Sequence, residues 1–221
     1  MAKSKTAYFC QNCGANSPKW VGKCPACGEW NTYVEEVVSK STGTLEKEVW
    51  QDETKVRNKP TRIQELTFDD QRRIKTNSGE LDRTLGGGIV PGSLVLIGGE
   101  PGIGKSTLML QMAIRMKSVK TLYASGEESL EQIRMRAERI GIDAENCFLI
   151  AETSLSDILT HAAQLKPDVL VVDSIQTLYT DNIEASVGSI SQVRECTGKL
   201  MKYAKQTGVP VFLIGHVNKE G

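Results

Sequence analysis

A nine-residue stretch rich in glycine is the part of this sequence best suited to chemistry on phosphate groups. Residues 99–107 match the phosphate-loop pattern G-x-x-x-x-G-K-S/T at every fixed position. The glycines let backbone N–H groups approach the β- and γ-phosphates, Lys105 supplies a positive charge, and the Ser106 hydroxyl is the expected ligand for Mg²⁺. We predict a nucleoside triphosphate site formed by Gly99, Glu100, Pro101, Gly102, Ile103, Gly104, Lys105, Ser106 and Thr107.

Acidic residues that follow apolar runs predict the second half of this site. Asp173 ends such a run and could hold Mg²⁺ through water or together with the Ser106 hydroxyl. Hydrolysis also needs a base for the attacking water, and we favour Glu127 over Glu128 for that role. The alternative is that one or both glutamates begin the next helix, which is the better interpretation of Glu128. His216 is a candidate for contacting the γ-phosphate, with a plain turn histidine as the alternative. The predicted catalytic residues are Glu127, Lys105 and Asp173.

Four cysteines near the N-terminus have the spacing of a metal site. Cys10, Cys13, Cys24 and Cys27 form two Cys-x-x-Cys pairs, each followed by a glycine that allows a tight turn. Four thiolates suit a closed, tetrahedral Zn²⁺ site of the structural kind, because so short a segment cannot bury a core of its own. An iron centre or two disulfides are the alternatives, and a reducing compartment disfavours the disulfides.

Composition sets only broad limits on partners. The 27 basic and 27 acidic side chains give a net charge of +0, which neither supports nor excludes DNA as a partner. No apolar run approaches the roughly twenty residues that cross a bilayer, and the first residues lead into no hydrophobic signal segment. We therefore expect a cytoplasmic protein with no membrane partner.

The pattern of residues divides the chain into three parts. We expect a four-cysteine zinc finger over residues 1–36, a polar linker over 37–59 that contains Trp50, and an α/β core over 60–221. In the core, apolar runs alternate with helical spacings, which predicts a parallel sheet flanked by helices. The phosphate-loop strand, at residues 94–97, has the continuous apolar character of a fully buried strand.

The remaining elements of the core follow from periodicity and capping signals. We expect five helices: over 78–85, directly after the phosphate loop, from Ser129 to Gly141, over 155–165, and from Ile190 to Gly208. The helix after the phosphate loop should bury Met109, Met112, Ala113 and Met116, and the helix from Ser129 should have Leu130, Ile133, Ala137 and Ile140 on one face. Further strands are expected at 121–125, 148–150, 169–172 and 211–214. His161 should lie on a polar helix face, and Cys147 and Cys196 should be small core residues rather than reactive thiols.

Two blocks of motifs resemble the bacterial RadA (Sms) family of DNA repair proteins. The cysteine segment, with Ser17–Trp20, Gly22 and Cys24–Asn31, is similar to the amino-terminal zinc finger of that family. The rest resembles its RecA-type ATPase core in the same order, at residues 79–83, 86–88, 91–99, 125–129, 171–177 and 215–217. The pairing of a zinc finger with a RecA-type core is unusual, so the joint resemblance is specific and spans the chain.

This resemblance implies a RecA-like P-loop ATPase that acts in DNA repair and homologous recombination. It implies a DNA-dependent ATP hydrolase, helicase-like, that moves on single-stranded DNA and extends strand exchange by branch migration. The implied cofactors are structural Zn²⁺ and Mg²⁺ with ATP. The implied partners are single-stranded and branched DNA, a recombinase of the RecA type, and further copies in a homo-hexamer.

The resemblance also carries expectations about geometry. It places the last strand between the phosphate-loop strand and the Asp173 strand, which would bring His216 close to the γ-phosphate. It places residues 178–187 at the DNA channel, although this loop contains Asp181 and Glu184 and neither lysine nor arginine.

Beyond the last residue of this sequence, the family has a Lys-Asn-Arg-Phe-Gly motif, further core strands and a Lon-protease-like domain. We therefore expect an incomplete core that binds nucleotide weakly, turns it over little and forms no stable ring. A nucleotide-binding module without turnover and a signalling ATPase similar to the clock kinases, without DNA motor activity, are the alternative readings.

Overall fold

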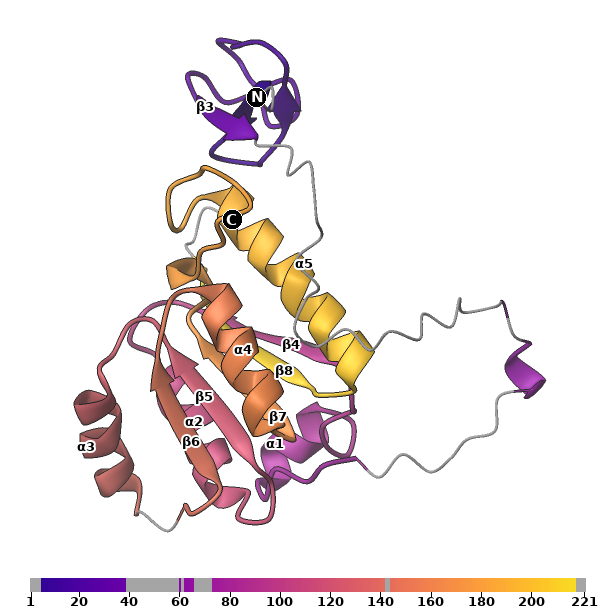
Figure 1. Cartoon of the computed structure of the whole chain (residues 1–221), viewed down its shortest axis with the longest axis vertical. Coiled ribbons are helices and arrows are strands. Elements are labelled where there is room, and N and C mark those ends of the chain that lie inside the picture. The colour runs from indigo at the N-terminus through magenta and orange to yellow at the C-terminus, as the bar shows by residue number, and fades with distance from the viewer. Residues whose placement is uncertain (1–4, 39–59, 61, 66–72, 142–143, 218–221) are drawn as a thin grey trace.

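Two separate sheets organise the chain, as Figure 1 shows. The computed structural model describes residues 5–38, 60, 62–65, 73–141 and 144–217. The N-terminal part, called here the ribbon, consists of residues 5–38 and holds an antiparallel sheet with strand order β2-β1-β3. Its strands are β1 (Lys5–Cys10), β2 (Asn16–Ser17) and β3 (Tyr33–Val38).

The larger sheet is parallel, with strand order β4-β8-β7-β5-β6. Its strands are β4 (Leu94–Gly99), β5 (Thr121–Ser125), β6 (Cys147–Ala151), β7 (Val169–Asp173) and β8 (Val211–His216). The α-helices are α1 (Gly79–Thr84), α2 (Lys105–Arg115), α3 (Leu130–Ile140), α4 (Leu155–Leu165) and α5 (Ile190–Thr207), and short 3₁₀ turns occupy Ile63–Glu65 and Ile175–Thr177. The predicted parallel sheet is confirmed, and β8, last along the chain, does lie between β4 and β7.

Helices cover both faces of this sheet and form two apolar cores. On one face α4 and α5 pack over side chains such as Leu170, Val172 and Leu213. On the other face α2 and α3 pack over Tyr123, Val171 and other side chains that alternate with the first set. The alternation follows from the two-residue repeat of a strand, so every residue of β5 and β7 is buried.

Capping residues set the ends of the helices much as the sequence predicts. Ser129 and Gln132 form both bonds of the capping box of α3, and Gly208 ends α5 in the left-handed conformation. Ser78 is the N-cap of α1 and makes no side-chain cap bond. One expectation is wrong: Leu130, predicted on the apolar face of α3, is 42% exposed at the first position of the helix.

Strand positions also differ from the prediction in three places. The strand β4 is not fully buried, since it pairs only with β8 in the described sheet and leaves Leu96 60% exposed. His216 is the last residue of β8 instead of following the strand in a turn. The strand β3 continues to Val38, inside the expected linker, and residues 39–59 with Trp50 lie outside the described residues.

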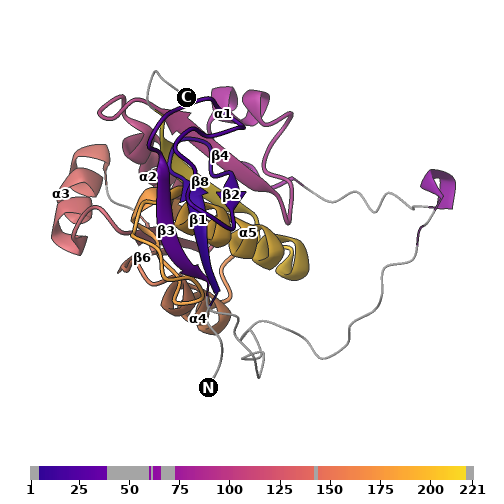
Figure 2. The ribbon, with the colours of Figure 1, turned by 90° about the horizontal axis from the view of Figure 1, so that it is seen from above.

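The ribbon lies beyond the N-terminal end of α5 (Figure 1), and Figure 2 shows it from above. The Arg194 guanidinium donates one hydrogen bond to the Gly14 carbonyl and one to the Cys13 carbonyl, each 2.8 Å long. A Cβ atom on Gly14 would lie 2.4 Å from Arg194 Nη1 and 2.7 Å from Ile190 Cγ2. The glycine after the first cysteine pair therefore permits both the tight turn, with φ +70, and the close approach to α5.

Among the described helices, none combines the length and apolar character needed to cross a membrane.

Candidate functional site

The predicted phosphate loop connects the end of β4 to the start of α2. Gly104 is the N-cap of α2 in the left-handed conformation, with φ 95, and Gly102 has φ 80, so both positions favour glycine. A Cβ atom on Gly99 would lie 2.4 Å from Ile103 Cδ1. Glu100, Pro101 and Ile103 are exposed, while Ser106 and Thr107 lie in the first turn of α2. Backbone N–H groups at this helix start can bind an anion.

Lys105 is held at the centre of the loop. Its side chain is buried, and Nζ donates hydrogen bonds of 2.8 Å to the carbonyl oxygens of Gly99 and Glu100. Nζ also lies 3.3 Å from His216 Nδ1. Because Gly99 and His216 are paired in register on β4 and β8, the sheet itself brings the histidine to the loop. The ammonium group is thus placed where phosphate oxygens would meet the loop.

Glu127 lies on the far side of His216 from Lys105. Its Oε1 is 2.9 Å from His216 Nε2, and the same oxygen accepts a hydrogen bond from the Ser174 hydroxyl. Lysine offers only donors and a carboxylate only acceptors, so a neutral imidazole with its proton on Nε2 satisfies both contacts of His216. The side chains of Lys105, His216, Glu127 and Ser174 therefore form one connected chain.

The surroundings of Glu127 favour its ionised form. Burial opposes ionisation of this carboxyl group, but hydrogen bonds from Ser174 and His216 and the charge of Lys105 outweigh it and lower the pKa of Glu127. The carboxylate can accept a proton and is near the positive charge of the loop. An ionised carboxylate in this position can orient an attacking water by accepting its hydrogen bond, while the lowered pKa weakens it as a proton acceptor.

Asp173 contacts a residue that the sequence did not single out. The Tyr123 hydroxyl donates a hydrogen bond of 2.6 Å to Asp173 Oδ2 and lies 3.4 Å from the carbonyl oxygen of Ser106. Burial and the nearby Asp173 carboxylate raise the pKa of Tyr123, so the phenol remains a donor. Asp173 Oδ1 is buried and has no hydrogen-bond partner among the described residues. A buried carboxylate oxygen without a protein partner fits a Mg²⁺ ion or its bound water.

Glu128 has a different environment from Glu127. Its carboxylate pairs with the Arg136 guanidinium of α3, and its backbone N–H donates a hydrogen bond of 3.0 Å to Ser125 Oγ. This agrees with its predicted place at the start of the helix. The sequence did not predict a role for Ser174, Tyr123 or Arg136. Ser174 could have been considered because it directly follows Asp173, whereas nothing in the sequence pointed to Tyr123 or Arg136.

The four N-terminal cysteines meet at one point in the ribbon. All four Sγ atoms lie within 4.8 Å of one another, with Cys10 and Cys27 separated by 3.7 Å and Cys13 and Cys24 by 3.6 Å. A tetrahedral zinc site with bonds of about 2.3 Å separates its sulfurs by about 3.8 Å, so these thiols fit Zn²⁺. All six cysteines of the chain are free, and the four of this cluster form no disulfide.

The four thiols lie so close together that the ionisation of each depends on its neighbours. Burial opposes ionisation of Cys10, but bonds with Thr32 and with backbone groups lower its pKa to about 6. The backbone at Ala15 lowers the pKa of Cys13, but burial and the three neighbouring sulfurs raise it to about 12. The four thiolates therefore repel one another unless a cation lies between them.

The other singled-out residues occupy structural positions. His161 is exposed on α4, as predicted. Cys196 is fully buried in the core under α5, and burial raises the pKa of both Cys196 and Cys147 to about 11. Cys196 is therefore a core residue as predicted, whereas the prediction of a core position is wrong for Cys147, which is only partly buried at the start of β6.

Comparison with known proteins assigns the larger part of the chain. The AAA domain family matches residues 57–221. The chain belongs to the AAA domain family. The rubredoxin metal binding domain matches residues 8–35, which contain the four clustered cysteines. The AAA domain assignment agrees with the parallel sheet and with the phosphate loop that joins β4 to α2.

Curated relatives match the AAA domain and the ribbon together. DNA repair protein RadA is 48% identical in Bacillus subtilis, 46% in Listeria monocytogenes and 46% in Pseudomonas aeruginosa, over 223, 227 and 222 residues. Each match covers 100% of this chain and 48% of the relative, so the chain spans about half the length of these relatives. The resemblance inferred from the motifs is confirmed, and the chain is a homologue of RadA.

Proposed function

We propose that the AAA domain of this chain binds ATP at residues 99–107 and hydrolyses it to ADP and inorganic phosphate. The observation that carries the proposal is the hydrogen-bonded series of side chains Lys105, His216, Glu127 and Ser174. It joins the phosphate loop to the carboxyl ends of β5, β7 and β8. Ligands bind at this edge in open parallel sheets.

Each side chain has a distinct part in this hydrolysis. Lys105 exchanges the carbonyl oxygens of Gly99 and Glu100 for phosphate oxygens, and the loop N–H groups bind the remaining charge. Glu127 takes the proton from the attacking water, whose oxygen bonds to the γ-phosphorus while the bond to the bridging oxygen of ADP breaks. His216 lies between the two groups and would contact the γ-phosphate.

The residues that would hold the metals are also proposals. Ser106 and Asp173 would hold Mg²⁺, which supplies positive charge that offsets the charge of the transferred phosphoryl group. The orphaned Oδ1 atom of Asp173 supports this assignment. In the ribbon, Cys10, Cys13, Cys24 and Cys27 would hold a structural Zn²⁺ ion.

The wider role of the chain is inferred from its relatives. The RadA proteins that it matches are named DNA repair proteins. We infer a DNA-dependent ATPase of repair and recombination that moves on single-stranded DNA and drives branch migration. Its proposed partners are single-stranded and branched DNA, a recombinase of the RecA type, and copies of the whole protein in a cytoplasmic homo-hexamer.

Steady-state ATP hydrolysis tests this proposal. Phosphate release by the 221-residue chain should be measured with Mg²⁺, with and without single-stranded DNA, beside a version extended to the length of the relatives. We expect DNA to stimulate hydrolysis at least in the longer protein. Nucleotide binding with no hydrolysis in either protein would favour a binding module, and autophosphorylation would favour a signalling ATPase.

A further inference from the structure

Two tryptophans are exposed on the ribbon and lie side by side. Trp20 is 55% exposed and Trp30 is 66% exposed. A Cβ atom on Gly22 would lie 3.6 Å from Trp20 Cη2 and 3.8 Å from Trp30 Cζ3, so both indole rings border this one glycine. Neither ring is part of the small core of the ribbon, which is built on Cys10, Cys24 and Tyr33. Two large rings are therefore exposed together without serving the fold.

Backbone contacts anchor the main chain beside both tryptophans. Directly before Trp20, Ser17 Oγ donates a hydrogen bond of 2.6 Å to the Lys19 carbonyl oxygen and accepts one of 3.3 Å from the Lys19 N–H. Directly after Trp30, the Asn31 N–H donates 2.8 Å to the Gly22 carbonyl, and Lys23 forms a β-bridge with Trp30. Rings on a fixed backbone lose little conformational freedom when a ligand binds.

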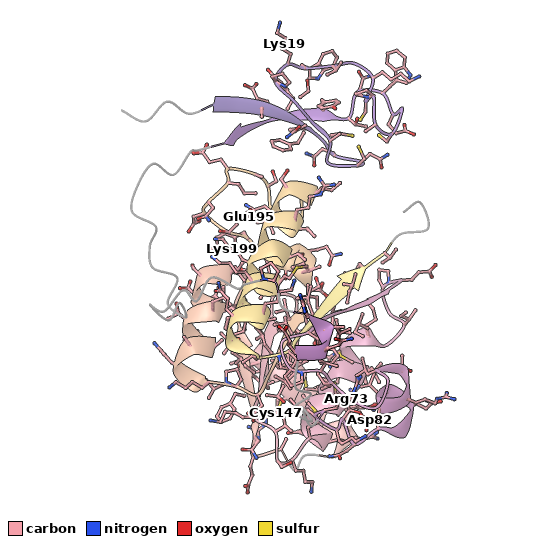
Figure 3. All side chains as sticks on the ribbon, turned by 90° about the vertical axis from the view of Figure 1, so that its right-hand side faces the viewer. Lys19, Arg73, Asp82, Cys147, Glu195 and Lys199 are labelled. Carbon is pink, nitrogen blue, oxygen red and sulfur yellow. The ribbon has the colours of Figure 1, made fainter. Side chains whose placement is uncertain are left out.

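Positive charge accompanies the rings. Lys23 Nζ lies 5.6 Å from the centre of the Trp30 ring, and Lys19 precedes Trp20. Figure 3 shows Lys19 at the outer end of the ribbon, pointing away from the core. Over residues 7–34 these lysines are the only basic residues and Glu29 is the only acidic one. Over the whole ribbon, residues 5–38, Lys5, Lys19 and Lys23 balance Glu29, Glu35 and Glu36, so the positive charge beside the rings comes from Lys19 and Lys23 alone.

We propose that Trp20, Trp30, Lys19 and Lys23 form a stacking platform for single-stranded DNA. Unpaired bases stack on aromatic side chains, and neighbouring lysines contact the backbone phosphates. Duplex DNA does not bind in this way because its bases are already stacked. The choice of DNA over RNA rests on the proposed function, whereas binding to the platform needs neither ATP nor hydrolysis.

The platform predicts a characteristic salt dependence. Two lysines can neutralise at most two phosphates, so the slope of log affinity against log salt should be about −1.4 or shallower for a single strand. Stacking supplies most of the affinity, and removing one ring should weaken binding about 5- to 150-fold.

The experiment uses the full chain with Trp50→Phe, so that Trp20 and Trp30 report alone. Titration with oligo-dT in the absence of nucleotide should quench their fluorescence. Fluorescence anisotropy of a labelled single strand measures DNA binding by the variants. The double variant Trp20→Leu with Trp30→Leu should lose the binding of DNA by the ribbon, whereas the double variant with Phe at both positions should retain most of this binding. Phe148→Leu, which replaces another exposed aromatic residue, is the matched control and should bind normally.

Zinc content separates loss of the platform from loss of the fold. If the leucine variant loses zinc, the double variant Lys19→Gln with Lys23→Gln tests the platform instead. This variant should keep zinc, and its DNA affinity should depend less on salt concentration.

Several outcomes would overturn the proposal. Undiminished DNA affinity in a zinc-loaded leucine variant would do so, as would an unchanged salt slope in the glutamine variant. Stronger binding of oligo-U would assign the platform to RNA. If the leucine variant lost binding to a recombinase of the RecA type but still bound DNA, the platform would be assigned to a protein partner. By contrast, loss of ATP hydrolysis with the fluorescence quenching intact would contradict only the proposed function, because binding to the platform needs neither ATP nor hydrolysis.

Discussion

At the scale of single residues, Lys105 and Glu127 have separable tasks although His216 connects them. Lys105 makes contacts to phosphate charge that exist before and during the reaction. Glu127 acts on the proton of the water, which moves only as the reaction proceeds. Binding and turnover should therefore respond differently to substitution of the two residues.

The first prediction concerns this separation. We expect Lys105→Ala to weaken ATP binding about 10- to 150-fold, since it removes charge-assisted hydrogen bonds. Glu127→Gln should bind ATP normally and lose hydrolysis by about 10²- to 10⁴-fold. Binding of a fluorescent ATP analogue and single-turnover hydrolysis measure the two effects. Glu128→Gln is the control, and a defect in its hydrolysis with Glu127→Gln active would reverse the assignment of the base.

The second prediction concerns the titration of Glu127. Its pKa in the folded protein is lowered from the ordinary value of 4.5, so the fold stabilises the carboxylate. The corresponding stability is fully present above pH 4.5 and is lost as the pH falls through the lowered pKa. We expect Ser174→Ala to raise this pKa, because it removes a donor to Oε1. Carbon NMR of labelled glutamate side chains would show the shift, and an identical midpoint in both proteins would refute it.

Sequence reasoning found the charged residues of the candidate site but not the polar residues between them. Lys105 and Asp173 belong to motifs with fixed spacing, and Glu127 was favoured because it follows a strand end. Tyr123 lies inside an apolar strand, where nothing in the sequence separates a phenol that contacts Asp173 from one that only fills the core. Its partner is 50 residues away along the chain, and only the pairing of β5 with β7 brings them together.

At the scale of elements, α5 joins the ribbon to the part of the core that follows β7. Gln192 of α5 is buried and bonds to the backbone of Thr180, Ile183 and Ala185, and Lys199 donates 2.9 Å to the Thr180 hydroxyl. Arg194 of the same helix contacts the ribbon. The loop before α5 and the ribbon are therefore fixed to opposite sides of one rigid helix.

The third prediction tests the contact between α5 and the ribbon. Arg194→Ala should release the ribbon from α5, because it removes two hydrogen bonds from a charged group that each contribute about 1 to 3 kcal/mol. The four cysteines are unchanged, so zinc should be retained. NMR relaxation should then show faster tumbling of ribbon amides relative to core amides. Lys205→Ala, on the same helix, should leave the tumbling unchanged. Equal tumbling of ribbon and core in Arg194→Ala would show that other contacts hold the ribbon.

The periodic signals located the helices and strands of the core closely, and the misplaced residues have a common cause. Leu96 was expected to be buried because continuous apolar runs are typical of central strands. Whether a strand is central depends on its neighbours in the sheet, which its own residues do not encode. The prediction that β8 lies beside β4 came from the family resemblance, not from periodicity.

At the scale of the whole molecule, the ribbon and the core depend on different sources of stability. The core buries two apolar clusters on a five-stranded sheet, whereas the ribbon buries only a few side chains around its cysteines. A metal that binds four thiolates would supply most of the folding free energy of the ribbon.

The fourth prediction follows from this difference. Cys24→Ser should abolish zinc binding and unfold the ribbon, because structural zinc contributes about 10 to 16 kcal/mol in small zinc domains. The core should keep its thermal transition. Elemental analysis, which should find one zinc per chain in the parent, and calorimetry test both parts. Ser17→Ala in the ribbon is the control and should retain zinc, while iron in the parent would change the identity of the metal.

The position of β8 has a consequence for synthesis of the protein on the ribosome. In the described sheet β4 pairs with β8 alone, although more than a hundred residues separate them in the chain. At about 5 to 20 residues per second, β4 emerges on the order of ten seconds before its partner. During that interval its apolar edge has no strand to pair with, and the phosphate loop cannot meet His216. A chaperone that shields extended apolar segments would have its longest opportunity at β4.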